Sequence, residues 1–487
     1  MGATPAARAV SGGKATLARR GGKAINLTVV VPRRYAKTLG KAIEEFRRKT
    51  GITVKDMLVV SEPDVLRRMK AEASSKTGRL DLFLAPSAGI PEGIESKVLL
   101  SLDDLIRAGL PDLNAAAPAF RNLGRYRSKT YGLFANEEIL ILVIRRDLTA
   151  LPAERSTFKR KYGWVPGCPD SWRQWKQLAE FYTRESTDKK NASKYYGALG
   201  VRSLGQGWRW WLQRYYSKGK APFDEEMNPT LDSPEAVEAT KEYVEISKYM
   251  PENSMAWTRE ESISAFLEGK VFSILTVASA IHGIKRPGRS KVAGKVKFCT
   301  VPGSLVGGGA FRRALTLGSV LWQINRYSRY PEAAYWLVQW LTSPQVSARL
   351  AARPNSNFTP HRPGHFEHPK IKASYTPEVI GILKGLMQIM VPEIPLVGAA
   401  EYQEVLSRNL FEAVPGTLSP RDAMMGTVKE WKEITAKLGR KRQIQAWRSH
   451  LRSLPKNDTS ENRFACSCLP WRTIWPTSFG GWHCRER

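Results

Sequence analysis

The sequence has no hydrophobic run long enough to cross a membrane. Its longest apolar stretches, Ile139–Ile144 and Val271–Ile281, are much shorter than the ~20 residues that a transmembrane helix requires. Cysteine is also scarce, and five cysteines in 487 residues cannot form the dense disulfide framework of a small secreted domain. We therefore expect Cys168 and Cys299 to be buried as small hydrophobic residues.

The motifs of common enzyme classes are missing. Residues 11–15 read S-G-G-K-A, which lacks both the first glycine and the magnesium-binding hydroxyl of a phosphate-binding loop. The chain contains neither a G-x-S-x-G nucleophile elbow nor an H-E-x-x-H helix. We therefore expect a protein that is not an enzyme.

Histidine and cysteine do not form a metal-binding pattern either. Prolines and a glycine break any helix through the central histidine cluster, which predicts a surface loop; the cluster is His361, His365 and His368. A second group would hold a soft metal only in a folded tail, and the tail has no helical or strand periodicity; the group is Cys466, Cys468, His483 and Cys484. The sequence thus predicts no metal and no cofactor.

Acidic residues are too few to balance the basic ones. The chain has 76 Lys and Arg against 45 Asp and Glu, a formal charge of +31. Residues 1–25 contribute +5 and residues 440–487 contribute +7, which leaves +19 spread over the middle of the chain. A nucleic-acid groove would concentrate basic residues between stacking aromatics. The diffuse charge therefore favours a solvated cationic surface, and we expect no nucleic-acid partner.

Strands and helices alternate along the middle of the chain. A strand over Ile25–Val31 precedes a helix over Ala36–Lys49, and Ile52–Val60 returns as a second strand. An S-x-x-D capping box at Ser61 starts another helix, which is followed by a buried strand at Leu80–Leu84. This alternation predicts an α/β fold with crossover connections.

Several phrases occur in the order found in one known family. They are Leu39–Val54 (L-G-K-A-I-E-E-F-R-R-K-T-G-I-T-V), Gly78–Pro86, Tyr131–Leu148, Pro169–Trp172, Ala265–Lys270 (A-F-L-E-G-K), Val301–Gly303, Tyr330–Pro344 and Ser419–Ala423. Through them, residues 26–445 resemble the family 1 extracellular solute-binding proteins, the ligand-capturing components of bacterial carbohydrate ABC importers, to which maltose-binding protein is related. Leu80 departs from the family pattern, which has proline there.

The resemblance implies a two-lobed periplasmic-binding-protein-like fold of class II, with mixed sheets flanked by helices and a ligand cleft between the lobes. The expected division is a basic segment at 1–25, lobe 1 at 26–138, lobe 2 at 139–305, a lobe 1 return at 306–360, lobe 2 and C-terminal helices at 361–445, and a Cys- and Trp-containing tail at 446–487. Hinge closure would desolvate the captured ligand and present a closed shape to the importer.

The resemblance also implies ligand contacts on the loops that follow strands. These positions are Arg33, Arg34, Tyr35, Pro86, Ser87, Asn136, Glu138, Trp208, Trp211, Ser279, Glu401 and Tyr402. Two alternatives remain open: Trp211 belongs to a helix core, and Arg33 and Arg34 face solvent. Trp208 is the preferred residue for stacking on a sugar ring. If both arginines enter the cleft, their guanidinium groups suit an anionic ligand such as a sugar phosphate.

The leading functional hypothesis is therefore a monomeric binding protein that delivers a carbohydrate or polyol to the permease subunits of an ABC importer. The alternatives are an anionic ligand such as a sugar phosphate, and polyanion or nucleic-acid binding through the basic surface. The family works in the periplasm, whereas Arg19-Arg20 is not followed by the apolar core of an export signal. We therefore expect either a start upstream of Met1 or a truncated copy.

Overall fold

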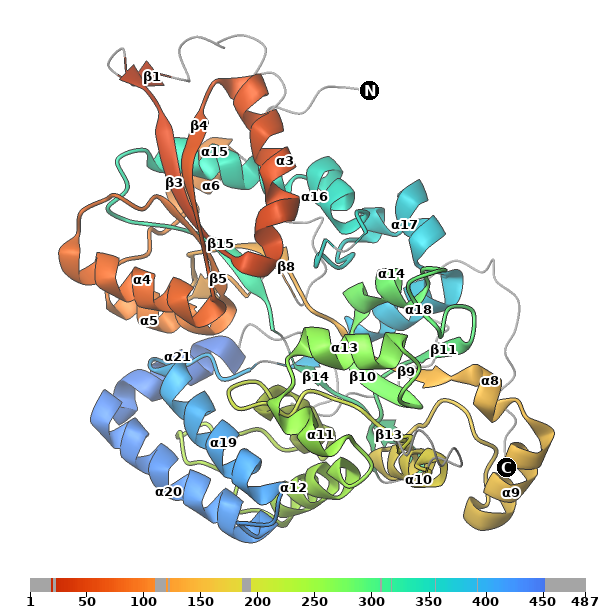
Figure 1. Cartoon of the computed structure of the whole chain (residues 1–487). Helices are drawn as coiled ribbons and strands as arrows, with labels where there is room; N and C mark the ends of the chain where they lie inside the picture. The colour runs from red at the N-terminus through yellow and green to blue at the C-terminus, as the bar shows by residue number, and fades with distance from the viewer. Residues whose placement is uncertain are drawn as a thin grey trace.

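The molecule has two lobes, each built around one of its two larger β-sheets (Figure 1). The computed structural model describes residues 19–20, 23–109, 120, 123–185, 194–306, 309–316, 318–354, 356–391 and 393–451. Lobe 1 contains a five-stranded sheet with the order β4-β3-β5-β15-β8, and lobe 2 contains a three-stranded sheet with the order β10-β9-β11. This is the two-lobed α/β architecture that the sequence predicted.

Lobe 1 surrounds its sheet with helices from both the start and the middle of the chain. Its strands are β3 (Asn26–Pro32), β4 (Thr53–Val60), β5 (Leu82–Pro86), β8 (Leu133–Asn136) and β15 (Val320–Ile324). Its helices are α3 (Arg33–Thr50), α4 (Glu62–Ser75), α5 (Ile90–Glu95), α6 (Asp103–Gly109), α15 (Pro331–Thr342) and α16 (Pro344–Ala351), with the hairpin β6 (Arg125–Tyr126) and β7 (Lys129–Thr130). Strand β3 runs parallel to β4 and β5, whereas β15 is antiparallel to β5 and β8, so the sheet is mixed.

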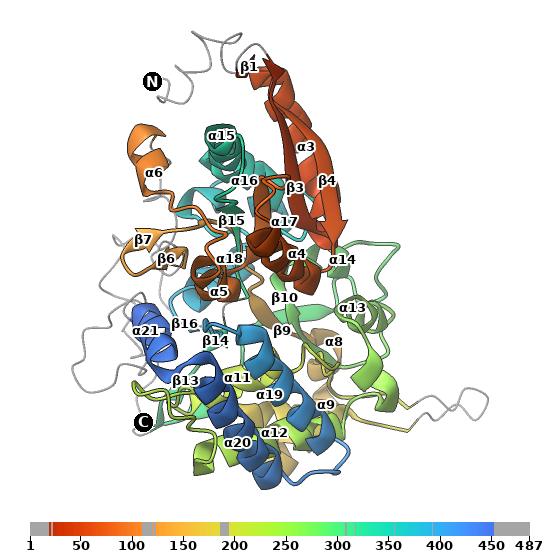
Figure 2. The ribbon, with the colours of Figure 1, turned by 90° about the vertical axis from the view of Figure 1, so that its left-hand side faces the viewer.

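Lobe 2 combines a small sheet with a larger group of helices. Its strands are β9 (Leu140–Arg145), β10 (Ser273–Val277) and β11 (Val296–Cys299). Its helices are α8 (Arg146–Thr149), α9 (Pro152–Tyr162), α10 (Trp172–Tyr182), α11 (Trp208–Ser217), α12 (Pro234–Ser247), α13 (Arg259–Leu267), α14 (Ile281–Ile284), α17 (Pro369–Ser374), α18 (Pro377–Leu386), α19 (Ala399–Ala413), α20 (Pro420–Leu438) and α21 (Arg440–Leu451). Figure 2 shows α19 and α20 beside α11 and α12, below the sheets.

Short paired segments complete the connections. They are β1 (Arg19–Arg20), β2 (Lys23–Ala24), β12 (Ser304–Leu305), β13 (Phe311–Arg312), β14 (Leu315–Thr316) and β16 (Met390–Val391). Strand β14 lies in the segment that returns to lobe 1, and β16 lies before α19. The two strands pair in parallel.

The predicted helix signals act locally as expected. Ser61 accepts a hydrogen bond from the Asp64 N–H at the start of α4, and Ser419 does the same for Asp422 at the start of α20. Helix α3 buries Leu39, Ile43 and Phe46 against the sheet, as its apolar spacing predicted. The alternation of strands and helices in lobe 1 is therefore confirmed.

The long apolar stretch from 131 to 145 forms two strands in different lobes. Strand β8 pairs with β15 in lobe 1, and β9 is the central strand of the lobe 2 sheet. The residues between them form the first crossing between the lobes.

Cys168 and Cys299 form a disulfide, so their prediction as separate buried thiols was wrong. They are 131 residues apart in sequence, but their Cα atoms are 5.5 Å apart, because β11 passes the loop before α10. Sequence spacing alone gives no sign of this proximity.

The histidine cluster is not a surface loop. His361 and His365 are both 1% exposed, and their rings meet edge to face at 4.6 Å. The His361 ring also packs on Phe134, and His365 Nε2 lies 2.9 Å from Ser347 Oγ. The prolines do break a helix, as predicted, but the turn that they form folds inward onto lobe 1.

The C-terminal domain boundary lies later than predicted. Residues 446–451, which were assigned to the tail, belong to α21, and Trp447 is completely buried beside Phe223. The cysteines and His483 of the tail lie outside the described residues.

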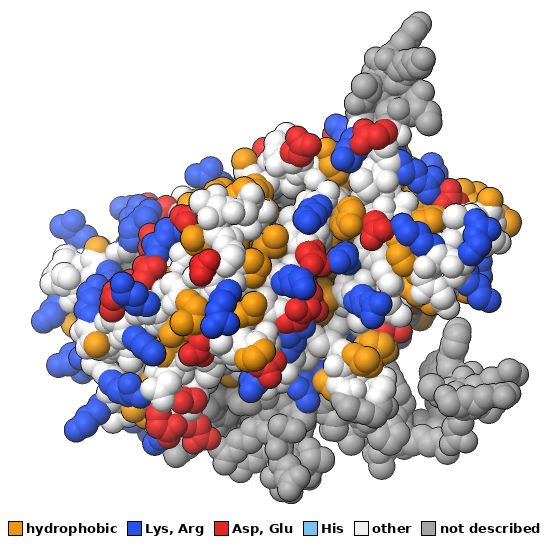
Figure 3. All heavy atoms as spheres, turned by 90° about the horizontal axis from the view of Figure 1, so that it is seen from below, with side chains coloured by type: hydrophobic (Ala, Val, Ile, Leu, Met, Phe, Trp, Pro, Cys, Tyr) orange, Lys and Arg blue, Asp and Glu red, His pale blue; other side chains and the backbone are white. Residues whose placement is uncertain are grey.

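The surface charge is dispersed over the lower face of the molecule. Figure 3 shows basic side chains distributed across this face with acidic ones among them. Among the described residues, no helix has the length and apolar character needed to cross a membrane.

We predict that removing the disulfide lowers stability. Cys168→Ser/Cys299→Ser removes the link that closes a loop of more than one hundred residues. Because the unfolded chain is then less constrained, the free energy of unfolding should fall by about 2–5 kcal/mol. Thermal melts should show a lower Tm for this variant, and a reductant should lower the wild-type Tm but not that of the variant. Equal Tm values for the wild type and the variant without reductant would contradict this prediction.

Candidate functional site between the lobes

The chain passes between the lobes three times, and these crossings meet at the cleft. The first crossing joins β8 to β9, the second joins β11 to β15, and the third follows α16 toward α18. The residues of the first crossing are Asn136, at the end of β8, followed by Glu137 and Glu138.

Asn136 and Glu137 tie the three crossings together. Asn136 Oδ1 accepts from the Thr359 N–H at 2.8 Å, and its Nδ2 donates to the Asn357 carbonyl at 2.9 Å. The carboxyl group of Glu137 accepts from the Gly318 N–H at 2.9 Å and is hydrogen-bonded to the Ser319 hydroxyl. Both side chains are fully buried, so they fix the backbone of the crossings and are not free to bind a ligand.

Glu138 joins the two lobes through arginine side chains. Its Oε1 lies 2.6 Å from Arg259 Nη1 of lobe 2 and 3.5 Å from Arg34 Nε of lobe 1. Arg34 also pairs with Glu62 at the start of α4. One carboxylate therefore takes part in ion pairs with both walls of the cleft.

A second ion pair lies beside this network. Arg209 Nε is 2.5 Å from Glu393 Oε1, and the Arg209 guanidinium lies 4.8 Å from the centre of the Trp208 ring. A Cβ placed on Gly318 would be 3.5 Å from Glu393 Oε1, 3.9 Å from Glu137 Oε1 and 4.0 Å from Arg209 Nε. The Arg209–Glu393 pair and Glu137 thus converge on the second crossing.

Burial and ion pairing shift the pKa values of the three cleft glutamates differently. Burial raises the pKa of Glu137 to about 8. The hydrogen bonds from Ser319 and Gly318 lower the pKa, but their effect is smaller than that of burial. Burial also opposes ionisation of Glu138, but Arg259 and Arg34 together lower its pKa to about 2. Burial raises the pKa of Glu393, although Arg209 acts in the opposite direction. Near neutral pH, Glu137 holds a proton and Glu138 is charged.

A pocket opens between the lobes next to this network. Its cavity volume is small, about 20 Å³, and its mouth is open to solvent. Its walls come from η1 (Ser87–Gly89), α5, β6 and its preceding loop, the segment before α19, and α21; they are Ser87, Ala88, Ile90, Pro91, Leu123, Arg125, Tyr126, Glu393, Pro395 and Ala446. Glu393 belongs both to the pocket wall and to the ion pair with Arg209.

The structure brings some of the predicted ligand contacts to the cleft. Arg34 and Glu138 belong to the ion-pair network, and Ser87 lines the pocket directly after Pro86, the last residue of β5. Tyr35 is buried next to them, with its ring 5.0 Å from that of Phe358.

Other predicted contacts lie elsewhere. Arg33 is exposed to solvent, so only one of the two adjacent arginines enters the cleft. Ser279 is 8% exposed in η4 (Ala278–Ala280) and does not line the pocket. Glu401 forms a surface ion pair with Lys437, 2.9 Å away.

The aromatic residues proposed for stacking are packed in lobe 2. Trp211 is completely buried and donates to Thr240 Oγ1, as its core alternative predicted. Tyr402 is buried against Trp431, so its face is covered by protein. Trp208 is 1% exposed at the start of α11, with Arg209 over its ring. These packing contacts correct the prediction that Trp208, Trp211 and Tyr402 present a ring face to a ligand in the cleft.

Several cleft residues had no recognised signal in the sequence. They are Glu62, Leu123, Tyr126, Arg209, Arg259, Glu393, Pro395 and Ala446. Arg209 lies inside the predicted tryptophan-rich segment and was passed over in favour of its aromatic neighbours. Arg209 and Glu393 are 184 residues apart, so their pairing depends on the tertiary fold.

The cleft is therefore that of a protein that binds a small molecule between two lobes. A sequence profile described as "Bacterial extracellular solute-binding protein" matches residues 41–376, more than half of the chain. The chain belongs to this family, whose members serve as the solute-binding components of ABC transporters and not as enzymes.

Known relatives are similar in sequence, and solved structures share the fold. A probable amino-acid ABC transporter periplasmic-binding protein from Sinorhizobium fredii is 23% identical over 378 residues, covering 74% of this chain and 78% of the relative. The maltose-bound MalE3 protein of T. maritima has a TM-score of 0.69 at 21% identity, covering 84% of this chain and 100% of the other. An Agrobacterium radiobacter solute-binding protein in complex with ribitol has a TM-score of 0.70 at 21% identity, covering 84% and 98%.

Metal ligands do not gather in the described part of the chain. No group of three or more His, Cys, Asp or Glu residues there is placed to hold an ion.

We predict that Glu137 makes stability fall as pH rises. Its ordinary pKa is 4.5 and its folded pKa is about 8, so between these values the folded chain holds a proton that the unfolded chain has lost. Stability should decrease by up to about 1.4 kcal/mol per pH unit and level off above pH 8. Glu137→Gln should remove this decrease, so its Tm advantage over wild type should grow from pH 5 to pH 8. Parallel Tm curves would contradict the prediction.

We predict that Glu138→Gln destabilises the fold by about 3 kcal/mol, because it leaves two largely buried arginines short of a carboxylate. Glu260→Gln is the matched control, since Glu260 pairs with the same Arg259 but is 69% exposed at the surface. Urea unfolding should show a loss of less than about 1 kcal/mol for the control. Similar losses in both variants would show that Glu138 has no special role.

Proposed function

We propose that this protein captures a carbohydrate or polyol in the interlobe cleft by hinge closure and delivers it to an ABC permease. The observation that carries this proposal is the pocket between the lobes with a charge-balanced ion-pair network at its side. Arginine and glutamate side chains provide donors and acceptors that suit ligand hydroxyl groups.

The balance of charge favours a ligand without net charge. Three arginines in the network are matched by three largely buried carboxylates: Arg34, Arg209 and Arg259 against Glu62, Glu138 and Glu393. The exposed Glu260 is a further carboxylate that pairs with Arg259. Glu137 adds no charge near neutral pH because burial raises its pKa to about 8. An anionic ligand would have to compete with carboxylates that already hold each arginine.

Structurally similar proteins bind ligands of this class. The solved neighbours include a maltose complex, a ribitol complex and a D-mannitol complex. These ligands belong to those proteins, and they define the compounds to test first here.

An amino acid is the second candidate ligand. The Sinorhizobium fredii relative is described as a probable amino-acid transporter component. An amino acid carries both charges, and the cleft offers arginines and carboxylates that suit a carboxylate and an ammonium group. A sugar phosphate is less favoured, because Arg34 is already paired with Glu62 and Glu138.

The same proposal includes a monomeric protein that works outside the cytoplasmic membrane and catalyses no reaction. The family supports this location. The Cys168–Cys299 disulfide supports it as well, because structural disulfides persist in oxidising compartments. The permease subunits would be the protein partner.

Calorimetric titration tests the ligand class. The panel is maltose, ribitol, D-mannitol, a sugar phosphate and a set of amino acids, each titrated into the folded full chain. We expect heat from a neutral carbohydrate or polyol. Heat from the sugar phosphate or an amino acid alone would assign the ligand to that other class, and no heat from any compound would contradict the proposal.

We predict that Arg34→Gln weakens binding at least tenfold, because it removes a donor from the lobe 1 wall of the cleft. Arg33→Gln is the matched control, with the same charge change on the next residue but an exposed side chain. Calorimetry on both variants measures the difference. Equal affinities would show that the ligand does not use the network.

A further inference from the structure

The last described helix, α21, contacts both lobes and stands beside the pocket. Figure 2 shows it next to the β6–β7 hairpin of lobe 1, and Figure 1 shows it under α5. It lies beyond residues 41–376, the part of the chain that matches the family profile.

Helix α21 packs against lobe 2 through buried side chains, hydrogen bonds and an ion pair. Trp447 is fully buried, with its ring 5.8 Å from Phe223. The buried Gln443 side chain accepts from the Val397 N–H at 3.2 Å and donates to the Val397 carbonyl at 2.7 Å. Arg448 pairs with Glu226 at 3.1 Å. The helix is therefore packed as part of lobe 2.

The opposite side of α21 is bound by the β6–β7 hairpin of lobe 1. Arg127 Nη2 donates to Gln445 Oε1 at 2.5 Å, and the Arg127 N–H donates to Ser449 Oγ at 3.1 Å. Glu95 of α5 lies 3.2 Å from Arg127 Nη2 and 3.7 Å from Arg442 Nε. One lobe 1 carboxylate is therefore shared by an arginine from each lobe.

The turn that presents Arg127 has an uncommon backbone. Arg127 and Ser128 have φ values of +46° and +67°, in the left-handed region where a two-residue hairpin turn ordinarily has Asn or Gly. Residues larger than glycine keep this backbone conformation where tertiary contacts hold it, and Arg127 has such contacts to α21 and to Glu95.

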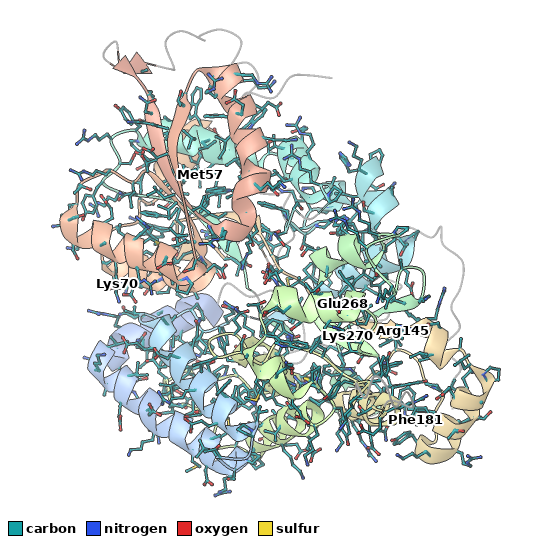
Figure 4. All side chains as sticks on the ribbon, in the orientation of Figure 1. Met57, Lys70, Arg145, Phe181, Glu268 and Lys270 are labelled. Atoms are coloured by element: carbon teal, nitrogen blue, oxygen red, sulfur yellow. A yellow bond between two sulfur atoms is a disulfide. The ribbon has the colours of Figure 1, made fainter. Side chains whose placement is uncertain are left out.

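These contacts are continuous with the pocket wall. Tyr126 lines the pocket and is followed by Arg127, and Ala446 lines it from α21 and is preceded by Gln445. A third contact lies along the same edge, where Glu92 of α5 accepts from the Gly398 N–H at 2.9 Å and pairs with Lys70 of α4, which Figure 4 labels at the lower edge of lobe 1.

We propose that Arg127, Glu95 and α21 form a clasp that holds lobe 1 against lobe 2 at the mouth of the pocket and slows the escape of a bound solute. Arg127 is a positioning residue in this device, since it acts on the lobes and not on the ligand. The effect on solute escape rests on the proposed function, whereas the effect on the lobe arrangement does not.

Small-angle scattering of the full chain without added solute tests the clasp directly. The clasp variant is Arg127→Gln/Arg442→Gln. The control is Arg408→Gln/Lys437→Gln, which makes the same charge change on lobe 2 ion pairs with Glu430 and Glu401, outside α21. We expect a larger radius of gyration for the clasp variant and a wild-type value for the control. A wild-type value for the clasp variant, or equal increases in both variants, would overturn the proposal.

Dissociation kinetics give the second measurement, with the solute that gives calorimetric heat. We expect the clasp variant to increase the dissociation rate about tenfold with little change in the association rate, and the control to match wild type. A Tm within a few degrees of wild type shows that the variant is folded; if it is not, Gln445→Ala/Ser449→Ala removes the two α21 acceptors of Arg127 without a charge change. Unchanged dissociation would contradict the sealing role. Absence of binding by wild type would contradict the proposed function and leave the scattering result to decide the clasp.

Discussion

The ion pairs and hydrogen bonds of Asn136, Glu137 and Glu138 fix the geometry on which the cleft depends. Asn136 binds the third crossing and Glu137 binds the second, while Glu138 pairs with an arginine from each lobe. Without these buried partners, the crossings would leave unsatisfied polar groups at the centre of the molecule. The residues that join the three crossings are therefore next to the residue that pairs with both walls of the cleft. A substitution that disturbs the crossings should also disturb the cleft.

The charge of the cleft differs from that of the chain. The sequence carries +31, but Arg34, Arg209 and Arg259 of the cleft network each have a carboxylate partner. Arg34, Arg209 and Arg259 each lie in the first turn of a helix, where the macrodipole disfavours a cation. Their carboxylate partners offset both this effect and the cost of burial. The overall basic charge is therefore a property of the surface and the chain ends, and it does not describe the ligand.

Much of lobe 1 could be predicted because its signals are local. Ser61 and Ser419 cap helices within three residues of their partners, and the apolar spacing of α3 defines its buried face. The ordered phrases of the family gave the two lobes and placed Arg34, Ser87 and Glu138 near the cleft. The ion pair of Arg209 with Glu393 and the disulfide of Cys168 with Cys299 could not be predicted, since they join residues brought together only by the folded chain.

The aromatic contacts show how a family pattern can mislead about a site. Trp211 and Tyr402 occupy positions expected to meet a ligand, but a large aromatic side chain also fills a helical core well, and here both do so. The cleft that remains has paired charges at its side and one aromatic residue, Tyr126, in the pocket wall. The clasp at α21 adds contacts outside the part of the chain that the family pattern covers.

A crystal structure of the protein with the solute that it binds most tightly would test the central claim directly. The account predicts that the solute lies between the lobes, with hydrogen bonds to the network of Arg34, Glu138, Arg209 and Glu393 and with the three crossings still joined through Asn136 and Glu137. A solute bound outside the interlobe cleft, or one that contacts none of these charged side chains, would contradict it.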